Sequence, residues 1–367
     1  MYIMKNPAAF FIVLLLLSGC KKQFLGPLST PWSISNGVLG HRLTISCSPK
    51  FAGAIYSLNW NGKEFLNSAD HGRELQSAAT FDGFGECFNP TEAGSAADAT
   101  ADTTTSSLLS FSTDSNQIKS STQMAFWTSV GQGYPAGCGI TNIKVAQNTT
   151  NLSNEILTKR VAIGFFGIPN VIAYQVTFHV AEHHSSAIFE SLTGYLTQDF
   201  SAFWTFDPAT GSLAPLSYGP GEQDKPIIFS TPAKNYAMGI YSPGLPEQSF
   251  PGLGYGRYSY LSQFTTKWSA FYHMGDTPAG DYNFQLYVVV GSLTQVAEGM
   301  TSIYKTLPSP LSVISHLRTS MYGDCISTKL IKTSPTSLQN GLAPQRGSNH
   351  STSHFFNPKN LFQMTFN

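Results

Sequence analysis

Strand-length runs separated by turns that contain Gly, Pro and Asn are the feature that most constrains this chain. Runs of this kind are typical of β-strands connected by tight turns. We expect strands at residues 53–60, 63–66, 124–130, 161–166, 171–180, 188–196, 227–230, 236–241, 267–273 and 282–290. Because almost no helical pattern accompanies them, the sequence predicts an all-β fold, a large antiparallel β-sandwich with little helix. A fixed-period repeat is lacking, which disfavours a propeller.

Two local signals are specific enough to assign element by element. Asn61-Gly62 follows the alternating run 53–60 and favours the tight turn of a hairpin, with 63–66 as the returning strand. Residues 293–304 carry apolar side chains at spacings of three and four, and Ser292 before them suits a helix N-cap. We therefore expect a hairpin early in the fold and a single helix near its end.

The composition excludes several classes of function. The 367 residues include 21 Lys and Arg against 21 Asp and Glu, so the formal net charge is zero and a basic face for nucleic acid is not expected. Aromatic residues make up 13%, which argues against disorder over most of the length. The sequence has no P-loop, no G-x-S-x-G elbow, no dinucleotide fingerprint and no C-x-x-C pair. We expect no cofactor and no metal.

The N-terminus has the pattern of an exported lipoprotein. Lys5 precedes an apolar core at residues 8–17, which is shorter than the roughly 20 residues that a membrane-spanning helix needs. This pattern predicts a signal peptide at residues 1–19. The segment Leu17-Ser-Gly-Cys20 resembles the bacterial lipobox, so Cys20 is the expected site of lipidation, including palmitate, and residues 20–31 are a lipid-anchored linker. The expected location is the bacterial cell envelope, at the outer membrane or cell surface. An ordinary signal peptide with a chance cysteine is the alternative.

The rest of the chain divides by composition. Residues 32–308 contain the strand-like runs and form the expected β-sandwich domain. Residues 309–367 are rich in Ser, Thr, Asn and Lys without strand alternation, and are interpreted as a low-order tail or a truncated second domain. Cys47, Cys87, Cys138 and Cys325 remain after Cys20, and export permits disulfides. Cys87–Cys138 is favoured because both lie in Gly-rich, loop-like segments.

One segment concentrates the polar chemistry of a charge-poor chain. Residues 70–92 hold Asp70, His71, Arg73, Glu74, Gln76, Asp82, Glu86, Asn89 and Glu92. Such groups suit sugar hydroxyls, since Arg offers a planar fork of donors and Asn and Gln both donate and accept. We expect His71 to move a proton, Arg73 to clamp an anion or hydroxyl, and Glu86 or Glu92 to be a second carboxyl group, with Gln76 and Asn89 binding ligand. The alternative is that ion pairs lock this loop in place.

His179-Val-Ala-Glu-His183 matches H-x-x-E-H, an inverted zinc-protease pattern. That motif works on a helix, whereas here it ends a strand-like run. On a strand the two histidines stand roughly 13 Å apart, too far to share one zinc. We expect no metal site, and His179 remains a candidate for a ligand-binding groove on a sheet face.

Aromatic side chains near Gly- and Pro-rich turns are a further candidate for sugar stacking. Tyr134 and Trp204 are the ligand-binding candidates in this set, and Arg257 would add an anion clamp. The set as a whole is Trp127, Tyr134, Trp204, Tyr255, Tyr258, Tyr260 and Trp268. Many of these rings are alternatively core residues, because large sandwiches bury aromatics.

The segment 53–66, GAIYSLNWNGKEFL, resembles the opening hairpin of galactose mutarotase-like proteins, and Gly72-Arg73-x-x-Gln76 is in keeping with their polar groove strand. The resemblance implies a β-supersandwich and a carbohydrate-active function of the aldose 1-epimerase, polysaccharide lyase or glycosidase type. The histidine motif and distal catalytic Glu of the epimerases are not identified here. In the related lyases a Tyr or His acts as base while Asn, Arg or His neutralises a uronate, roles that Tyr134, His71, Asn89 and Arg73 would fill.

These observations together predict an exported, lipid-anchored protein that acts on or binds a poly- or oligosaccharide. If it is an enzyme, the expected reaction is acid–base chemistry at a sugar ring, lyase- or epimerase-like. The alternative is a non-catalytic glycan-binding or structural envelope lipoprotein.

Overall fold

The computed structural model describes residues 32–134, 138–139, 142–245, 247 and 249–307. The predicted signal peptide with Cys20 and the tail after residue 308 lie outside the described residues. No helix in the described part is long and apolar enough to cross a membrane.

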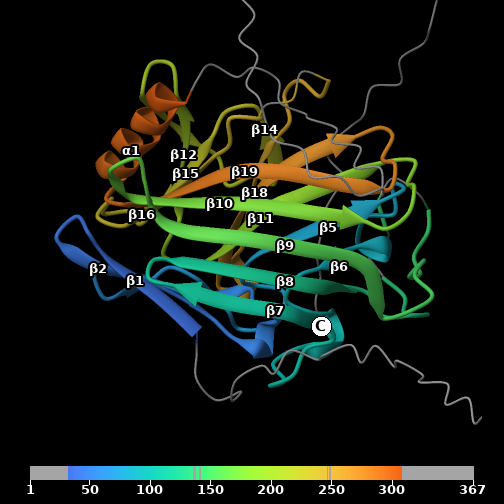
Figure 1. Cartoon of the computed structure of the whole chain (residues 1–367). Coiled ribbons are helices and arrows are strands. Elements are labelled where there is room, and N and C mark those ends of the chain that lie inside the picture. The colour runs from blue at the N-terminus through green and yellow to red at the C-terminus, as the bar shows by residue number, and fades with distance from the viewer. Residues whose placement is uncertain (1–31, 135–137, 140–141, 246, 248, 308–367) are drawn as a thin grey trace, which may run out of the picture.

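The described residues form 19 strands, and their hydrogen-bonded pairs are antiparallel, in agreement with the all-β prediction. One continuous run of pairs forms what we call the first sheet (Figure 1). Its strands, in spatial order, are β7 (Ser107–Asp114), β8 (Gln117–Phe126), β9 (Leu152–Phe165), β10 (Ile168–Val180), β19 (Gly280–Gly291), β16 (Ala237–Tyr241), β15 (Ile227–Ser230), β12 (Ala202–Asp207) and β13 (Ser212–Leu216).

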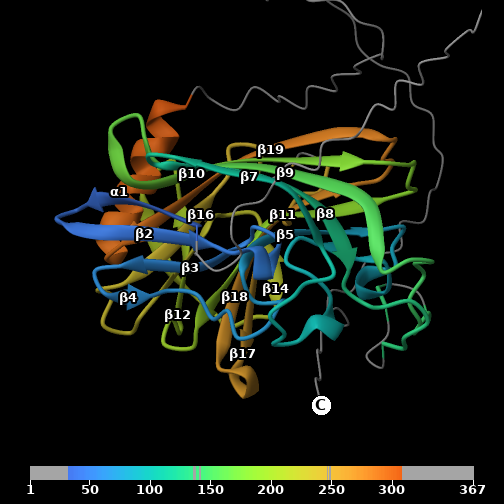
Figure 2. The same cartoon turned by 60° about the horizontal axis from the view of Figure 1, so that its bottom comes forward.

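A second run of pairs forms the second sheet, whose early strands are seen best in Figure 2. Its strands are β1 (Trp32–Val38), β2 (His41–Cys47), β3 (Ile55–Trp60), β5 (Leu75–Phe81), β11 (Ala187–Thr197), β18 (Thr265–Met274), β17 (Tyr255–Tyr260) and β14 (Gly221–Gln223). The short β4 (Lys63–Glu64) pairs with β3, and β6 (Pro90–Thr91) pairs with both β5 and β8 and so connects the two sheets.

The main core lies between the two sheets. Ile118, Val161 and Tyr174 from the first sheet share one apolar cluster with Leu192 and Trp268 from the second. Strand alternation explains this arrangement, because successive side chains point to opposite faces. The molecule is therefore a β-sandwich, which confirms the predicted fold class.

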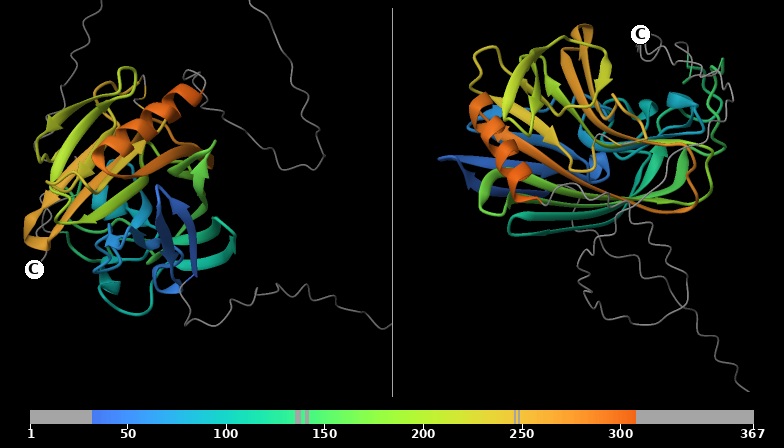
Figure 3. Two further views of the ribbon diagram at one scale, coloured as in Figure 1. Left: turned by 90° about the vertical axis from the view of Figure 1, so that its left-hand side faces the viewer. Right: turned by 90° about the horizontal axis from the view of Figure 1, so that it is seen from above.

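The helix α1 (Leu293–Thr306) covers the outer face of the first sheet at one end, next to β16 and β19 (Figure 3). Successive side chains of β19 point to opposite faces of the first sheet. Leu286 and Val288 face the main core, whereas Val289 packs with Met300 of the helix. Ser292 caps α1, accepting a hydrogen bond from the Gln295 N–H, as predicted.

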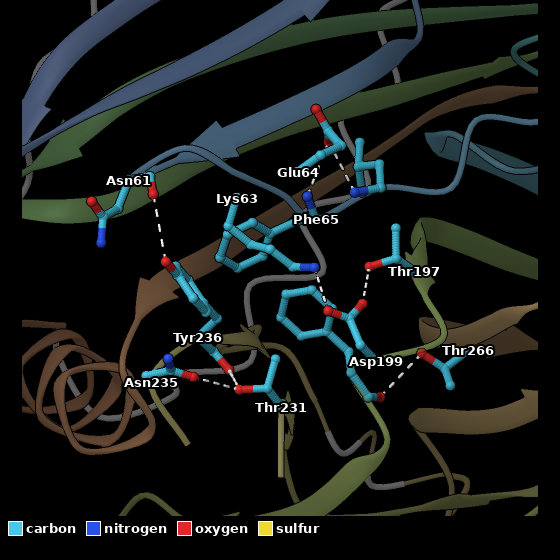
Figure 4. A network of polar contacts seen from close by, with 12 residues as sticks. Asn61, Lys63, Glu64, Phe65, Thr197, Asp199, Thr231, Asn235, Tyr236 and Thr266 are labelled. Carbon is cyan, nitrogen blue, oxygen red and sulfur yellow. Dashed lines mark hydrogen bonds and ion pairs between the residues drawn. The ribbon is translucent and has the colours of Figure 1, made fainter. Parts of the chain in front are cut away.

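The predicted hairpin is also present, as β3 and β4, with Asn61 and Gly62 both at positive φ. Lys63 at its turn pairs with Asp199, which follows β11 and also accepts a hydrogen bond from the Thr197 hydroxyl at 2.5 Å (Figure 4). The Tyr236 hydroxyl donates to the Asn61 carbonyl on the other side of the turn. These contacts fix the hairpin against the end of β11.

Several strands differ from the sequence expectation. The run expected at 124–130 is instead the end of β8, which begins at Gln117. The strands that are not among the expected runs are β1, β2, β5, β6, β7, β12, β13, β14 and β17. Strand β7 shows why: half of its sequence SLLSFSTD is Ser and Thr, with no strict alternation, and its side chains are largely exposed. Pairing with β8 holds it in place, and Phe111 adds an apolar contact by stacking on Trp32 of β1.

Candidate functional site

A polar pocket lies on the outer face of the second sheet, over β5, β11, β18 and β17. Its empty space, including the part open to solvent, is about 560 Å³. We call it the sheet pocket. It is lined by Asp70, Gly72, Arg73, Gln76, Ala78, Glu86, Asn89, Thr91, Trp127, Glu190, Thr193, Tyr195, Tyr260, Gln263 and Lys267.

Strand alternation places the floor residues of the sheet pocket. On β5, Gln76 and Ala78 face the pocket. Leu75, Ala79 and Phe81 belong to the core. On β11, Thr193 and Tyr195 face the pocket while Leu192 belongs to the core. The polar side chains of these strands therefore gather on one face, opposite the apolar interior.

An irregularity in β11 adds Glu190 to this floor. The pairing register shifts after Glu190 against both β18 and β5. Phe189 before the shift and Leu192 after it both face the core, although simple alternation would send them to opposite faces. A β-bulge has this effect, since one extra residue re-aims the side chains around it. Glu190 and Thr193 consequently both face the pocket.

Loops that follow β4 and β5 build the walls. The 3-10 turn η2 (Gly85–Phe88) carries Glu86, and its Cys87 forms a disulfide with Cys138, the pairing that the sequence favours. Trp127 closes another side and packs on Gly72, where an added Cβ would come within 2.5 Å of the indole ring. Only glycine leaves room for the ring at this position.

Glu190 and Lys267 form an ion pair at the centre of the pocket floor. The Lys267 Nζ donates to Glu190 Oε2 over 2.9 Å, and the Ser269 hydroxyl lies 3.4 Å from the same oxygen. Burial alone lowers the pKa of Lys267, but Glu190 and other nearby charges raise it overall. The ammonium and the carboxylate therefore hold each other in place.

Glu86 lies in the same pocket, and none of the described Lys or Arg side chains forms an ion pair with it. Its carboxyl group accepts a hydrogen bond from the Asn89 Nδ2 at 3.1 Å. Burial, reinforced by the negative charge of Glu190, raises the pKa of Glu86 to about 7. Glu86 therefore exchanges a proton near neutral pH, which is where a general acid or base is most effective.

The second cation of the pocket is also engaged. The Arg73 Nη2 lies 3.0 Å from Asp70 Oδ2, and its Nη1 donates to the Gln263 carbonyl at 3.1 Å. Both positive groups of the sheet pocket are thus already paired with a carboxylate of the same pocket.

The remaining lining offers both apolar surface for the C–H groups of a sugar and an acceptor for one of its hydroxyl groups. Trp127, Tyr195 and Tyr260 offer aromatic surface. The Oδ1 of Asn89 is buried and accepts no hydrogen bond from any residue that the structure describes. A buried acceptor without a donor is costly, and a hydroxyl group in the pocket would supply one.

Four of the predicted catalytic and ligand-binding residues meet in this pocket: Arg73, Gln76, Glu86 and Asn89. Asp70 from the same segment and Trp127 and Tyr260 from the aromatic set also line it. Gln76 is partly committed to the fold, because its Oε1 accepts a hydrogen bond from the Ala93 N–H at 3.0 Å. The polar segment 70–92 thus supplies one side of the site.

His71 lies behind the pocket wall rather than in it. Its side chain is buried, with Nδ1 2.8 Å from the Ala99 carbonyl oxygen and Nε2 3.0 Å from that of Lys50. Both ring nitrogens are therefore occupied by the backbone of two loops. These contacts fit the loop-locking alternative better than the proton transfer we expected of His71.

Glu92 also points away from the sheet pocket. It follows the pocket residue Thr91, so strand alternation turns it into the interior, where it is completely buried and pairs with Lys159 of β9. Its Oε2 accepts a hydrogen bond from the Ser77 N–H at 3.1 Å. Besides Glu86, the carboxyl groups of the pocket are therefore Glu190 and Asp70, and not Glu92.

The other ligand-binding candidates lie elsewhere. Tyr134 is near enough to Glu86 for that carboxylate to raise its pKa, together with the larger effect of burial, yet it does not line the pocket. His179 pairs with Asp281 at 2.7 Å at the end of strand β10. Trp204 packs beside α1 and donates to the Ser230 hydroxyl, and Arg257 bonds Ser217.

Sequence reasoning missed the half of the site that comes from β11 and β18, including Glu190, Thr193, Tyr195 and Lys267. The only available signal was a charged residue inside each otherwise apolar or neutral strand, Glu190 in one and Lys267 in the other. Opposite charges in two candidate strands suggest a buried pair, but they do not show that the strands are neighbours.

No protein-family model matches the sequence, and no curated protein matches it. Solved structures similar to this chain include a galactose mutarotase-like protein from Lactobacillus casei ATCC 334, at 11% identity over 71% of this chain and 100% of that one, with a TM-score of 0.39. An alpha-mannosidase from Enterococcus faecalis V583 is 12% identical over 76% of this chain and 32% of that one, with a TM-score of 0.40. A mutant heparan sulfate lyase from Pedobacter heparinus is 12% identical over 71% of this chain and 35% of that one, with a TM-score of 0.33.

Proposed function

We propose that the sheet pocket binds a neutral sugar residue and carries out acid–base chemistry on its ring. The observation that carries this proposal is that two carboxyl groups in different environments line the same pocket. Glu86 has a pKa raised to about 7, whereas Glu190 is bonded to the Lys267 ammonium. A buried carboxyl group whose pKa lies near 7 suits a general acid, and the second carboxyl group on the pocket floor is then the candidate base.

In this proposal Glu86 donates its proton to a sugar oxygen, and Asn89 orients the carboxyl group through its Nδ2. Glu190 accepts a proton from a sugar hydroxyl, and Lys267 remains bonded to it throughout. One proton enters the substrate and one leaves it, so the charge of the pocket is unchanged. Trp127 and Tyr260 hold the ring by its C–H faces.

The charges of the pocket favour a neutral sugar over a uronic acid. Arg73 is paired with Asp70, and Lys267 with Glu190. A uronate would need a free cation and would instead meet Glu86, Glu190 and Asp70. This argues against the polysaccharide-lyase form of the expectation and in favour of epimerase- or glycosidase-like chemistry.

The resemblance of residues 53–66 and 72–76 to galactose mutarotase-like proteins supports a carbohydrate substrate. We also propose that the protein is exported and attached to the cell envelope by lipid on Cys20, because of the lipobox-like LSGC segment. Metabolic labelling with radioactive palmitate tests the anchor. Label in the wild type and none in Cys20→Ser is expected, and label in both would overturn it.

The activity is tested with the full mature chain and a panel of sugars. Anomer interconversion of free hexoses is followed by NMR, hydrolysis of neutral oligosaccharides by reducing ends, and cleavage of uronate polymers by the ultraviolet absorbance of the unsaturated product. We expect turnover on a neutral substrate, and a loss of about 10²-fold or more in Glu86→Gln and in Glu190→Gln.

The outcomes separate the alternatives. Binding without any product would replace the enzyme by the glycan-binding alternative. Product from uronate polymers alone would overturn the neutral-sugar assignment. Silence across the whole panel, with neither binding nor product, would count against a carbohydrate function.

A further inference from the structure

A second hollow lies at the end of the sandwich, on the other side of the segment that carries Glu86. Its floor is formed by Phe81, Phe88 and Phe126, and its other sides come from the segment between β8 and β9, from β9 and from the turn after β10. Its empty space, including the part open to solvent, is about 600 Å³. We call it the end pocket.

The two pockets share their dividing wall. Glu86 and Asn89 face the sheet pocket, while Phe88 between them faces the end pocket. Trp127 and Phe126 divide in the same way, one to each side. The end pocket is therefore a separate site with its own lining, and none of its residues belongs to the proposed acid–base machinery.

The floor of the end pocket is an aromatic platform. The rings of Phe88 and Phe126 are stacked, with centroids 5.0 Å apart and planes 18° from parallel. Phe88 is only partly buried, so its ring contributes apolar surface to the pocket. A flat apolar surface of this kind packs well against the C–H face of a sugar ring.

Asn148 places an unused acceptor at this platform. The residue is 5% exposed, and its Nδ2 donates to the Thr150 carbonyl at 2.9 Å. Its Oδ1 receives no hydrogen bond from any of the residues that the structure describes. Buried amide oxygens are normally satisfied, so this atom calls for a donor in the pocket.

The charges of the lining restrict the occupant. Glu155 and Glu182 line the end pocket, and among its described lining residues none is Lys or Arg. Glu155 is buried and accepts a hydrogen bond from the Ala181 N–H, with His184 Nε2 4.0 Å away. An anion would meet carboxylates and find no cation on the walls. Gln147, Thr149 and Asn154 at the rim both donate and accept, as hydroxyl groups require.

We propose that the end pocket is a second binding site for a neutral sugar residue, stacked on Phe88 and bonded to Asn148. The site is separate from the proposed catalytic one and does not depend on it. A protein with both would hold a glycan at one pocket while a sugar unit occupies the other, which raises the effective concentration at the sheet pocket.

The test uses the full mature chain with methyl glucopyranoside, methyl galactopyranoside and methyl mannopyranoside as neutral probes, and methyl glucuronoside as the acidic one. Binding is measured by titration calorimetry and by saturation-transfer NMR. The sheet pocket is disabled in advance by Gln263→Trp, which fills it from a partly exposed lining position and leaves the Glu190–Lys267 pair intact, so that remaining binding reports the end pocket.

We expect at least one neutral probe to bind this disabled protein and the acidic probe not to bind. Asn148→Leu removes the acceptor and should weaken binding about tenfold or more. Asn154→Trp fills the rim from an exposed position and should do the same without disturbing the interior. Asn283→Leu, an exposed amide on β19, is the matched control and should leave binding unchanged.

Two results would overturn the proposal. The first is that no neutral probe binds the disabled protein. The second is that binding survives both Asn148→Leu and Asn154→Trp. Failure of catalysis alone leaves this test intact, because it reads binding in a protein whose sheet pocket has already been disabled.

Discussion

Lys267 and Glu190 bond over 2.9 Å although both side chains are more than nine-tenths buried. The ammonium also lies 5.2 Å from the centre of the Tyr195 ring, which is its cross-strand partner on β11. The bulge after Glu190 makes this pair possible, because it turns the carboxylate to the pocket face. A buried charge pair of this kind is poor evidence of stability in itself, but it is sensitive to the loss of either partner.

Replacing one partner of this pair should therefore destabilise the fold. Lys267→Met leaves the Glu190 carboxylate buried and without its cation, and we expect a loss of about 3–5 kcal/mol in the free energy of unfolding. Denaturant unfolding followed by circular dichroism measures it. The double variant Lys267→Met with Glu190→Gln should recover much of that loss, and a double variant as unstable as the single one would contradict the pairing.

Glu86 should give the stability a distinct pH dependence. Its pKa is raised from 4.5 to about 7 by burial, so the folded state holds the proton more tightly than the unfolded state. The contribution of Glu86 is therefore fully present below pH 4.5 and is lost as the pH rises through 7. The free energy of unfolding should change by about 3 kcal/mol over this window, because each unit of pKa shift corresponds to about 1.4 kcal/mol.

Glu86→Gln isolates this effect because the amide does not titrate. The difference in unfolding free energy between wild type and variant, measured at pH values from acid to mildly alkaline, should favour the wild type progressively less as the pH rises. A difference that stays constant across the window would show that Glu86 keeps an ordinary pKa.

The fold was largely predictable from the sequence because its signals are local. The turn Asn61-Gly62 and the capped helix after Ser292 are each determined by neighbouring residues, and both were correctly predicted. Strand β7 was missed because its Ser- and Thr-rich sequence gains its structure from pairing with β8. Such pairing joins segments through backbone groups, which no side-chain pattern reveals.

The candidate site was predictable only on one side. Glu86 and Asn89 stand in a segment where polar residues are dense, and density is visible in sequence. Thr91 faces the pocket and Glu92 faces Lys159 because of the register in which β6 pairs with β5 and β8. Glu190 faces the pocket because of the bulge in β11. Both are set by contacts between strands far apart in the chain.

His71→Ala should act on stability rather than on the site. The imidazole joins the loops that carry Ala99 and Lys50 through both ring nitrogens. Loss of these bonds and of the buried ring should lower the free energy of unfolding by about 2–4 kcal/mol. Ligand binding, measured below the melting temperature, should change less than threefold. Full stability with abolished turnover would instead return His71 to the catalytic role expected from the sequence.

The Cys87–Cys138 disulfide should stabilise the wall that carries Glu86. It closes a loop with a sequence separation of 51, and Cys87 lies next to Glu86 in η2. The double variant Cys87→Ser with Cys138→Ser should lose about 4 kcal/mol by the loop-entropy estimate. Thermal unfolding with and without reductant measures this. The wild type should respond to reductant and the variant should not, whereas equal responses would exclude this disulfide as the cause.

Replacing Gly72 should weaken ligand binding strongly but still allow the protein to fold. An added Cβ would come within 2.5 Å of the Trp127 ring, so Gly72→Ala must push the indole away from its place in the pocket wall. The cost to folding should be about 1–3 kcal/mol, as for other overpacked sites. We expect sugar affinity at the sheet pocket to fall about tenfold, with a change in the intrinsic fluorescence from Trp127. Trp127→Ala removes the obstacle, so Gly72→Ala in that background should cost little further stability. An equal cost in both backgrounds would show that the ring is not what Gly72 accommodates.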